Sequence, residues 1–173
     1  MDQLPAEKLR QLIDRQEIED CVLRFCRGID RMDREMVLSA YHEGAKCDHG
    51  AFAGDVEEYV DFSMASHRER QHAHNLFSLN HRCEFESADL AHAETYWFML
   101  QQNREAPLNV VIGGRYLDRF ERRDGRWAIA FRRCILEFRV TLGDVETPPE
   151  VAALLARAGV ASRDRDDPSY RRD

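Results

Sequence analysis

The sequence predicts an α+β protein in which N-terminal helices pack against the concave face of a curled antiparallel sheet. In the first part of the chain, apolar residues recur at the spacing of an α-helix, and from Phe77 onward they alternate with polar residues, as in a β-strand. Asp124 and Gly125 form a two-residue hairpin signal between two such strand-like runs. Helices followed by an antiparallel meander are typical of the α+β class.

Length and charge limit the number of domains and the classes of partner that the chain can have. A chain of 173 residues fits one domain, and its net charge of -7, from 25 basic and 32 acidic residues, argues against a nucleic-acid or anionic-membrane partner. No apolar run reaches the roughly 18 residues that span a bilayer. The start "MDQLPAEKLR" lacks the apolar core of a signal peptide, so we expect a cytoplasmic protein. The five cysteines are never spaced C-x-x-C, which predicts reduced thiols.

Three helices are expected before the sheet. In "IDRQEIEDCVLRFCRGI", Asp14 is a candidate N-cap with Glu17 as its capping-box partner. Asp33 can cap a second helix through "REMVLSAYH", and Asp55 with Glu58 repeats the capping box before "VEEYVDFSMASH". One apolar stripe of the first helix faces the core and comprises Ile18, Cys21, Val22, Phe25 and Ile29.

Four strands are then expected, in "FSLNHRCEF", "AHAETYWFML", "NVVIGGRYLDRFER" and "WAIAFRRCILEF". Gly113-Gly114 predicts a bulge or sharp bend, since no helix follows to make a phosphate loop. Strands such as "YWFML" are apolar on both faces, so we expect a homodimer or homotrimer formed through the outer face of the sheet. After Gly143, the chain predicts a short apolar helix, "EVAALLARAG", and a charged end.

Asp30 is the first candidate functional residue. It lies in the last turn of the first helix, at the border of the apolar stripe. A carboxylate near a helix C-terminus is electrostatically unfavourable, by a few tenths of a kcal/mol or more. The residue either bends the chain into the next helix or has a function that offsets this cost.

A cluster of histidines is the second candidate, in "SHRERQHAHNLFSLNH". Histidine is the side chain best suited to moving a proton near neutral pH, and Asp30 is a candidate partner for one of the four. The alternative is a polar loop. His72 and His74 could also be two metal ligands, but no other run of ligands supports a metal site.

Aromatic residues on the core-facing positions are the third feature. Most should be core, although a cavity between helices and a curled sheet would be lined by such residues. They are Phe25, Tyr41, Phe77, Tyr96, Trp97, Phe98 and Tyr116.

In the order of its segments, the sequence resembles the SnoaL-like family of the nuclear-transport-factor-2-like (NTF2-like) superfamily. The segments are "RQEIEDCVLRFCRGIDRMD", "AYHEGAKCDHGAFAG", "DVEEYVDF", "HAHNLFSLNHRCEF", "AHAETY" and "GGRYLDRFERRDGRWAIAFR". Enzymes of this family include scytalone dehydratase, bile-acid 7α-dehydratase and hexachlorocyclohexane dehydrochlorinase. The resemblance implies a cone-shaped α+β barrel over residues 1–145, followed by a C-terminal helix and charged tail over 146–173.

The resemblance also implies a catalytic pair. Asp30 matches the family's aspartate at the end of the first helix, and a histidine before the long strand should be the base that it orients. The family pattern there is H-x-x-x-N, whereas this chain has His74 six positions before Asn80, or His72 three before Asn75. We assign the role to His74, with His72 as the fallback.

Phe25 stands where some family members have a tyrosine that polarises a substrate carbonyl. An oxyanion donor would then have to be Tyr41, Tyr96 or Tyr116. With Phe25 and Arg115, these three are the candidate substrate-binding residues.

The leading hypothesis is a cofactor-free, metal-free lyase or isomerase, dehydratase-like, for an apolar ring compound such as a steroid or polyketide. The alternative is a non-catalytic small-molecule-binding or assembly module, including a role like that of a ring-hydroxylating dioxygenase β-subunit, because fold does not fix function. A catalytic role requires the Asp–His pair to meet in a pocket, and a binding module does not.

Overall fold

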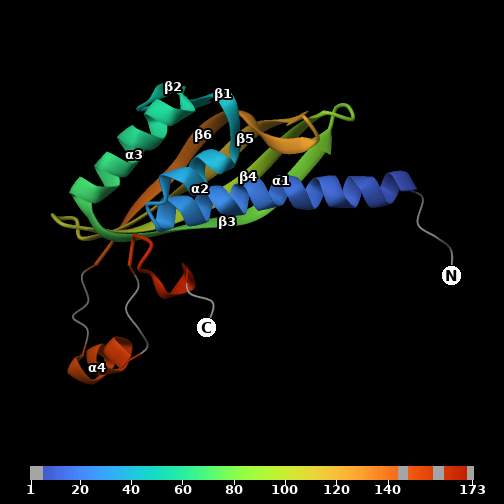
Figure 1. Cartoon of the computed structure of the whole chain (residues 1–173). Helices are drawn as coiled ribbons and strands as arrows, with labels where there is room; N and C mark the ends of the chain where they lie inside the picture. Colours follow the sequence, from blue (N-terminus) through green and yellow to red (C-terminus); the bar gives the residue numbers. More distant parts are fainter. Residues whose placement is uncertain (1–5, 144–147, 158–161, 171–173) are drawn as a thin grey trace.

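The computed structural model describes residues 6–143, 148–157 and 162–170, and it confirms the predicted α+β class (Figure 1). The helices are α1 (Ala6–Asp30), α2 (Arg34–Ser39), α3 (Val56–Arg70) and α4 (Pro149–Arg157). The strands are β1 (Tyr41–Asp48), β2 (Ala53–Asp55), β3 (Gln71–Phe85), β4 (Leu90–Asn103), β5 (Asn109–Arg123) and β6 (Arg126–Leu142). A short 3-10 helix follows at Pro168–Tyr170.

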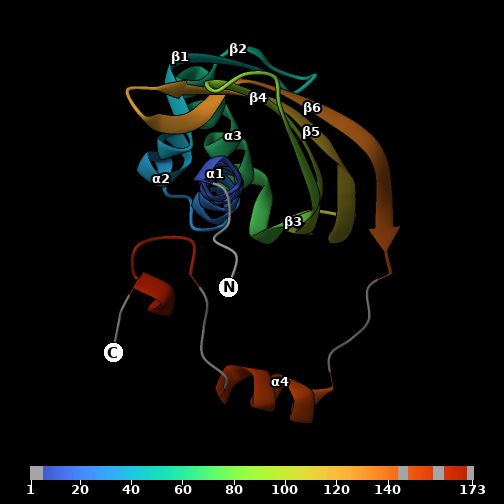
Figure 2. The same ribbon diagram turned by 90° about the vertical axis from the view of Figure 1, so that its right-hand side faces the viewer.

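The six strands form one sheet in the order β2-β1-β6-β5-β4-β3. All neighbours are antiparallel except β1 and β6, which are parallel. Figure 2 shows the sheet curling over α1 and α3, so that its concave face and these helices enclose the core. The strands β1 and β2 were not predicted, because the segment "AYHEGAKCD" has no strict alternation over a long enough run.

Helix α1 begins earlier than its capping signal predicts. It starts at Ala6, so Asp14 lies inside the helix and is not its N-cap. The Asp14 carboxylate is buried and accepts hydrogen bonds from Trp127 Nε1 at 3.0 Å and from Arg122 Nη1 at 2.7 Å. The hydrogen-bond donors of Asp14 therefore come from β5 and β6, although the local sequence predicts that Asp14 caps the start of the helix.

The other two capping predictions have different outcomes. Asp33 caps α2 as predicted, accepting from the backbone N–H of Met36 at 3.1 Å. Asp55 occupies the N-cap position of α3 but makes no side-chain cap, because its carboxylate forms an ion pair with Lys46 at 2.5 Å.

Glycine residues shape the sheet where the sequence predicts. Asp124 (φ 52°) and Gly125 (φ 78°) both have left-handed backbone, as a tight hairpin between β5 and β6 requires. The register of β5 against β6 shifts between Gly113 and Gly114, which confirms the predicted bulge.

Replacing Gly114 with alanine should destabilise the protein by about 2–4 kcal/mol. A Cβ at this position would lie 1.8 Å from the carbonyl oxygen of Ile135, so the backbone of the bulge must move. Urea denaturation measures the loss. Gly143→Ala is the matched control, because a Cβ there meets no atom within 4 Å. Equal midpoints for the two variants would contradict this account of the bulge.

The described part of the charged tail packs on its own chain. Arg31, just after α1, forms an ion pair with Asp167 at 2.9 Å, and Tyr170 Oη donates to Asp33 at 2.8 Å. The predicted tail helix is α4, whose described side chains are exposed.

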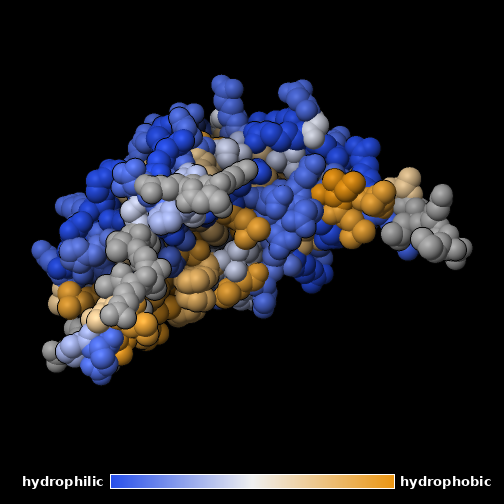
Figure 3. Space-filling model, turned by 60° about the horizontal axis from the view of Figure 1, so that its bottom comes forward, coloured by the Kyte–Doolittle hydropathy of each residue, from blue (hydrophilic) through white to orange (hydrophobic). Residues whose placement is uncertain are grey.

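Two groups of exposed apolar side chains stand out among several. On the outer face of the sheet, Phe77 of β3 stacks on Phe98 of β4 with ring centroids 4.6 Å apart. At the start of α1, Figure 3 shows a patch of apolar surface, where Leu9, Leu12 and Ile13 are exposed. The homo-oligomer expected through the outer face stays a prediction. Among the described residues, no helix is both long and apolar enough to cross a membrane.

Candidate functional site

A cavity of about 240 Å³ lies between α3 and the concave face of the sheet. Strands β4, β5 and β6 form its floor, and α3 and the loop after β1 form the opposite wall. Its lining is mostly apolar and includes Phe52, Tyr59, Phe62, Trp97, Met99, Ile112, Tyr116 and Leu136. Such a lining suits an apolar ring.

Two polar groups that line the cavity have no hydrogen-bond partner among the described residues. They are His49 Nε2 and Trp97 Nε1, and both atoms are buried. The His49 ring stacks on Tyr59 with centroids 3.8 Å apart. Burial, with a smaller effect of the Arg132 charge, lowers the pKa of His49 to about 3, so its imidazole is neutral. Both nitrogens are available to a polar atom of a ligand.

Asp30 lies at the junction of α1 and β3, one strand away from the β4 residues that line this cavity. Its Oδ1 accepts a hydrogen bond of 2.7 Å from the backbone N–H of Leu76. Leu76 pairs across the sheet with Met99, which lines the cavity, whereas Asp30 itself does not line it. Burial raises the pKa of Asp30 to about 6, although the Leu76 N–H and the charge of Arg31 act in the opposite direction. A carboxylate with this pKa is a stronger base than an ordinary aspartate.

His74 is buried close to Asp30, but both of its ring nitrogens have other partners. Nε2 lies 2.9 Å from the carbonyl oxygen of Ile29, so it carries the proton and donates. Nδ1 lies 3.2 Å from Arg163 Nη1 and accepts from it. Burial, with His67 and Arg163 acting in the same direction, lowers the pKa of His74 to about 4. In this structure the predicted hydrogen bond between His74 and Asp30 is absent. The strand residues bonded to Asp30 are Leu76, through its backbone N–H, and Asn75, through its side chain.

The other three histidines of the cluster point to different surroundings. His67 lines the cavity, stacks near His74 with centroids 4.5 Å apart and bonds Gln71 Oε1 through Nδ1 at 2.8 Å. His72, the fallback, is exposed, and its partner is Arg104. His81 lies further along β3. In the described part of the chain, no group of three metal-ligating side chains is close enough to hold an ion.

Behind the cavity, Arg132 and Asp118 form a buried ion pair. Both side chains are 0% exposed, and two hydrogen bonds of 2.7 Å join them. The guanidinium lies between the rings of Phe25 and Tyr116, 4.2 and 4.1 Å from their centroids. Its Nη1 has no partner among the described residues. Burial alone would lower the pKa of Arg132, but the Asp118 charge raises it well above its usual value, so Arg132 stays cationic and its charge is paired with the Asp118 carboxylate.

Of the predicted substrate-binding residues, only Tyr116 lines the cavity. Phe25 and Tyr41 are buried behind it, edge-on to each other. Tyr96 is 40% exposed on the outer face, where Arg115 lies over its ring and pairs with Glu94 and Glu137. Tyr96 and Arg115 lie outside this cavity, because each is one position out of phase with a strand residue, Trp97 or Tyr116, that does line it.

Sequence reasoning missed His49, Trp97 as a polar group, and the Arg132–Asp118 pair. A signal for the pair was present. Asp118 alternates with Tyr116 and Phe120, and Arg132 with Ala130 and Cys134, so both charges occupy inward strand positions. A charge on such a position is almost always paired.

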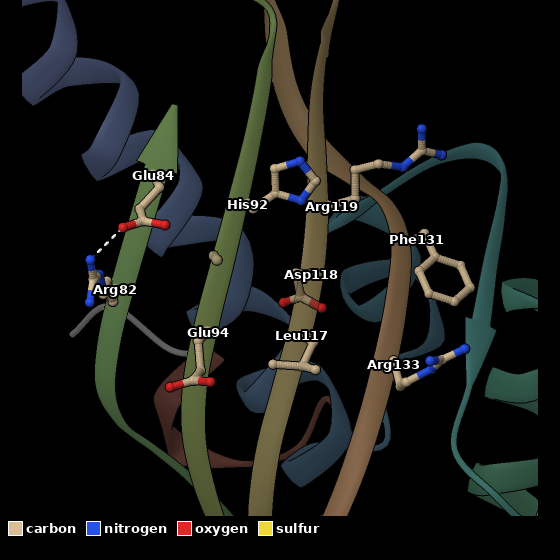
Figure 4. A pocket seen from close by; sticks show the side chains of 10 residues that line it. Arg82, Glu84, His92, Glu94, Leu117, Asp118, Arg119, Phe131 and Arg133 are labelled. Carbon is tan, nitrogen blue, oxygen red and sulfur yellow. Dashed lines mark hydrogen bonds and ion pairs between the residues drawn. The ribbon is translucent and has the colours of Figure 1, made fainter. Parts of the chain in front are cut away.

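A larger hollow, of about 580 Å³, lies on the outer face of the sheet (Figure 4). Its side chains are mainly charged and come from successive strands, including Arg82 and Glu84, which pair with each other, His92 and Arg133. The helices lie behind the strands in this view, so the hollow is separated from Asp30 and the cavity by the sheet. We therefore place the candidate site on the concave side.

Comparison with known proteins supports a shared fold. No curated protein matches the chain. A hexachlorocyclohexane dehydrochlorinase (LinA type 2) superposes with a TM-score of 0.75 at 23% identity, over 82% of this chain and 98% of that chain. LinA type 3 from Novosphingobium barchaimii gives 0.74 at 23%, over 82% and 99%. A proposed scytalone dehydratase from Novosphingobium aromaticivorans gives 0.70 at 13%, over 82% and 96%.

The NTF2-like fold is thus shared with dehydrochlorinases and with a proposed dehydratase. The model of the SnoaL-like domain matches residues 10–133, which is most of the described sheet and all of the helices that cover it except the first residues of α1. The chain belongs to the SnoaL-like domain family.

Proposed function

We propose that this protein is a cofactor-free lyase or isomerase that binds a small apolar ring compound in the cavity and moves a proton with Asp30. The observation that carries the proposal is the Asp30 carboxylate, which the Leu76 N–H holds one strand away from the cavity-lining β4 and whose pKa is raised to about 6. A base of this pKa is ionised at neutral pH and yet takes a proton more readily than an exposed carboxylate. It would abstract the proton next to an activating group, after which a leaving group departs or the proton returns at another carbon.

The geometry favours Asp30 over His74 as the proton acceptor. A base needs a free lone pair, and His74 Nδ1 already accepts from the cationic Arg163. A second proton on His74 would place two positive charges 3.2 Å apart, which is unfavourable in a buried site. His74 instead fixes the carbonyl of Ile29, the residue before Asp30, and so acts as a positioning residue.

Negative charge that develops on the substrate would be met by Tyr116. Burial raises the pKa of Tyr116 well above its usual value, so its hydroxyl stays protonated and can donate. The Arg132 guanidinium lies 4.1 Å from the centroid of the same ring and presents the cationic end of its ion pair with Asp118. Preorganised donors and charges of this kind supply much of the rate enhancement of enzymes.

The cavity size restricts the substrate. Pockets that hold drug-sized ligands measure roughly 300–1,000 Å³. At about 240 Å³ the cavity suits a compound of one or two rings better than a four-ring steroid.

A pH–rate profile tests the role of Asp30. Candidate substrates are small hydroxylated or halogenated ring compounds, screened for loss of water or halide or for a shifted double bond. We expect kcat/KM to rise about tenfold per pH unit below pH 6 and to level off above it, because only the ionised carboxylate of Asp30 accepts a proton. A profile that is flat between pH 4.5 and 7 would rule out Asp30 as the base.

A second candidate function is ligand binding without catalysis. It is favoured by the fact that Asp30 does not line the cavity and that His74 is bonded elsewhere. A tight ring ligand that is recovered unchanged after long incubation, together with no turnover in the screen, would support this alternative.

A further inference from the structure

A second hollow adjoins the cavity at the end of α3. It measures about 590 Å³ and is bounded by the last turn of α3, the turn between β4 and β5, and Arg139 of β6. Ser66, His67 and Gln101 line both this hollow and the cavity, so the two spaces are contiguous. A ligand that fills the small cavity can therefore extend into the larger hollow.

The hollow, called the arginine pocket below, has an excess of unpaired positive charge. Arg70, Arg104 and Arg139 line it. Arg163 donates to the carbonyls of two lining residues, His67 and Gln71, and lies close enough to Arg104 and Arg68 for their charges to lower its pKa after the larger effect of burial. In the described ranges, none of these five has a carboxylate within 4 Å, whereas ten other arginines of the chain do.

Two glutamates, Glu69 and Glu105, also line the arginine pocket but pair with none of its arginines. A local surplus of arginine is notable in a chain whose net charge is -7. Like charges brought together without partners destabilise a fold, so they need another source of compensation.

Backbone contacts hold this arrangement in place. The N–H of Arg104 donates to the carbonyl of Arg70 at 2.9 Å, which fixes the β4–β5 turn against the end of α3. Arg163 donates to the carbonyls of His67 and Gln71 at 3.3 and 2.8 Å. These bonds explain the position of Arg163 as a partner of the α3 C-terminus. Within the described ranges, no hydrogen bond or ion pair gives the guanidinium groups of Arg70 and Arg139 a structural role.

We propose that the arginine pocket binds an anionic group, a phosphate or a carboxylate, on the tail of a substrate whose ring occupies the cavity. The proposal rests on the proposed function and adds to it the chemical class of the substrate, an apolar ring joined to an anion. Guanidinium groups bind both anions through paired, charge-assisted hydrogen bonds. The anion cannot enter the apolar cavity without a large desolvation cost, so the two hollows set the orientation of the substrate.

The test compares three probes that share a phenyl ring and a four-carbon spacer: phenylbutanol, phenylpentanoate and phenylbutyl phosphate. Isothermal titration calorimetry at low ionic strength should show the two anions binding at least about tenfold more tightly than the alcohol, with the advantage lost as salt is added. The ratio of carboxylate to phosphate affinity then shows which anion the pocket prefers.

The double variant Arg70→Gln, Arg139→Gln should abolish the advantage of the anions and leave the affinity for phenylbutanol unchanged. Both side chains are exposed, and circular dichroism checks that the fold is kept. Arg10→Gln is the matched control: it removes the same charge from an exposed position near the start of α1 and should leave all three affinities as they are.

Equal affinities for the three probes, or an anion preference that survives in the double variant, would overturn the proposal. A failure of the proposed function would give a different result from a failure of the arginine-pocket proposal. If phenylbutyl phosphate binds in an Arg70- and Arg139-dependent way while phenylbutanol does not bind, the arginine pocket is supported and the ring site in the cavity is not.

Discussion

Replacing Asp30 with asparagine is expected to lower kcat by one to two orders of magnitude while the fold stays intact. Asparagine keeps the shape, and its Oδ1 can still accept the N–H of Leu76, but it cannot take a proton at neutral pH. General-base catalysis contributes typically 10²–10⁴-fold, and part of it is retained when water replaces the base. Steady-state kinetics on a substrate from the screen measures the loss.

His74→Ala is the informative companion of this variant. As a positioning residue, His74 should affect kcat less than Asp30 does and should leave the midpoint of the pH profile in place. If His74→Ala removes the ionisation near pH 6 and Asp30→Asn does not, the original assignment of His74 as the base is correct. The double variant should be little worse than Asp30→Asn alone, because the two groups act as a unit.

The Asp30→Asn variant should also be more stable than the wild-type protein at neutral pH. The pKa of Asp30 is about 6 in the folded chain and roughly 3.9 in an unfolded one, so the folded state binds more protons between these values. The favourable contribution of Asp30 to the free energy of unfolding is therefore complete below about pH 4, and it is lost as the pH rises through 6. Allowing for solvent screening of a partly buried group, Asp30→Asn should gain about 1–2 kcal/mol at pH 8 and little at pH 4. Urea denaturation at the two pH values tests this sign.

Replacing Arg132 with methionine is expected to destabilise the protein by about 3–5 kcal/mol, because it leaves the buried Asp118 carboxylate without its partner. It also removes the cation that packs between Phe25 and Tyr116. Out of a total stability of some 5–15 kcal/mol for an ordinary domain, this loss is large. The urea midpoint should fall markedly.

Two further variants separate charge from packing. The double variant Arg132→Met, Asp118→Leu removes both charges and should recover much of the stability, as replacement of a buried pair by apolar residues often does. Arg132→Lys keeps the charge but loses the paired hydrogen bonds, so it should lie between wild type and Arg132→Met. If the double variant is as unstable as the sum of its single changes, the ion pair is not what holds this region together.

The fold could be predicted to the extent that local pattern decides it. Consecutive residues determine three features: the alternation in β3 to β6, the Asp124-Gly125 hairpin and the Gly113-Gly114 bulge. The sequence predicts all three, and the structure has them. The start of α1 was misplaced because Asp14 has the local signature of a cap, whereas its partners Arg122 and Trp127 come from the other end of the chain. No local rule contains that information.

The candidate site was harder to predict for the same reason. The alternation of strand residues would have placed Tyr116, and not its neighbour Arg115, on the face of the cavity. The same alternation predicts the inward position of Arg132. The partner of His74 could not be predicted from the sequence, because Arg163 lies 89 positions away in a segment with no regular pattern. Resemblance to a family supplies the residue types of a site, but the hydrogen bonds that decide which of them can act depend on the whole chain.

The contacts of Asp14 have a consequence for how the molecule forms during synthesis. Its two partners lie 108 and 113 positions later in the chain, so a ribosome working at about 5–20 residues per second needs roughly 5–20 s to deliver them. Until β5 and β6 have emerged, α1 carries a carboxylate on the side that must later be buried, and burying it unpaired is costly. The first helix to be made is thus held back from docking until the last strands of the sheet arrive, which couples the two ends of the barrel in a single late folding step.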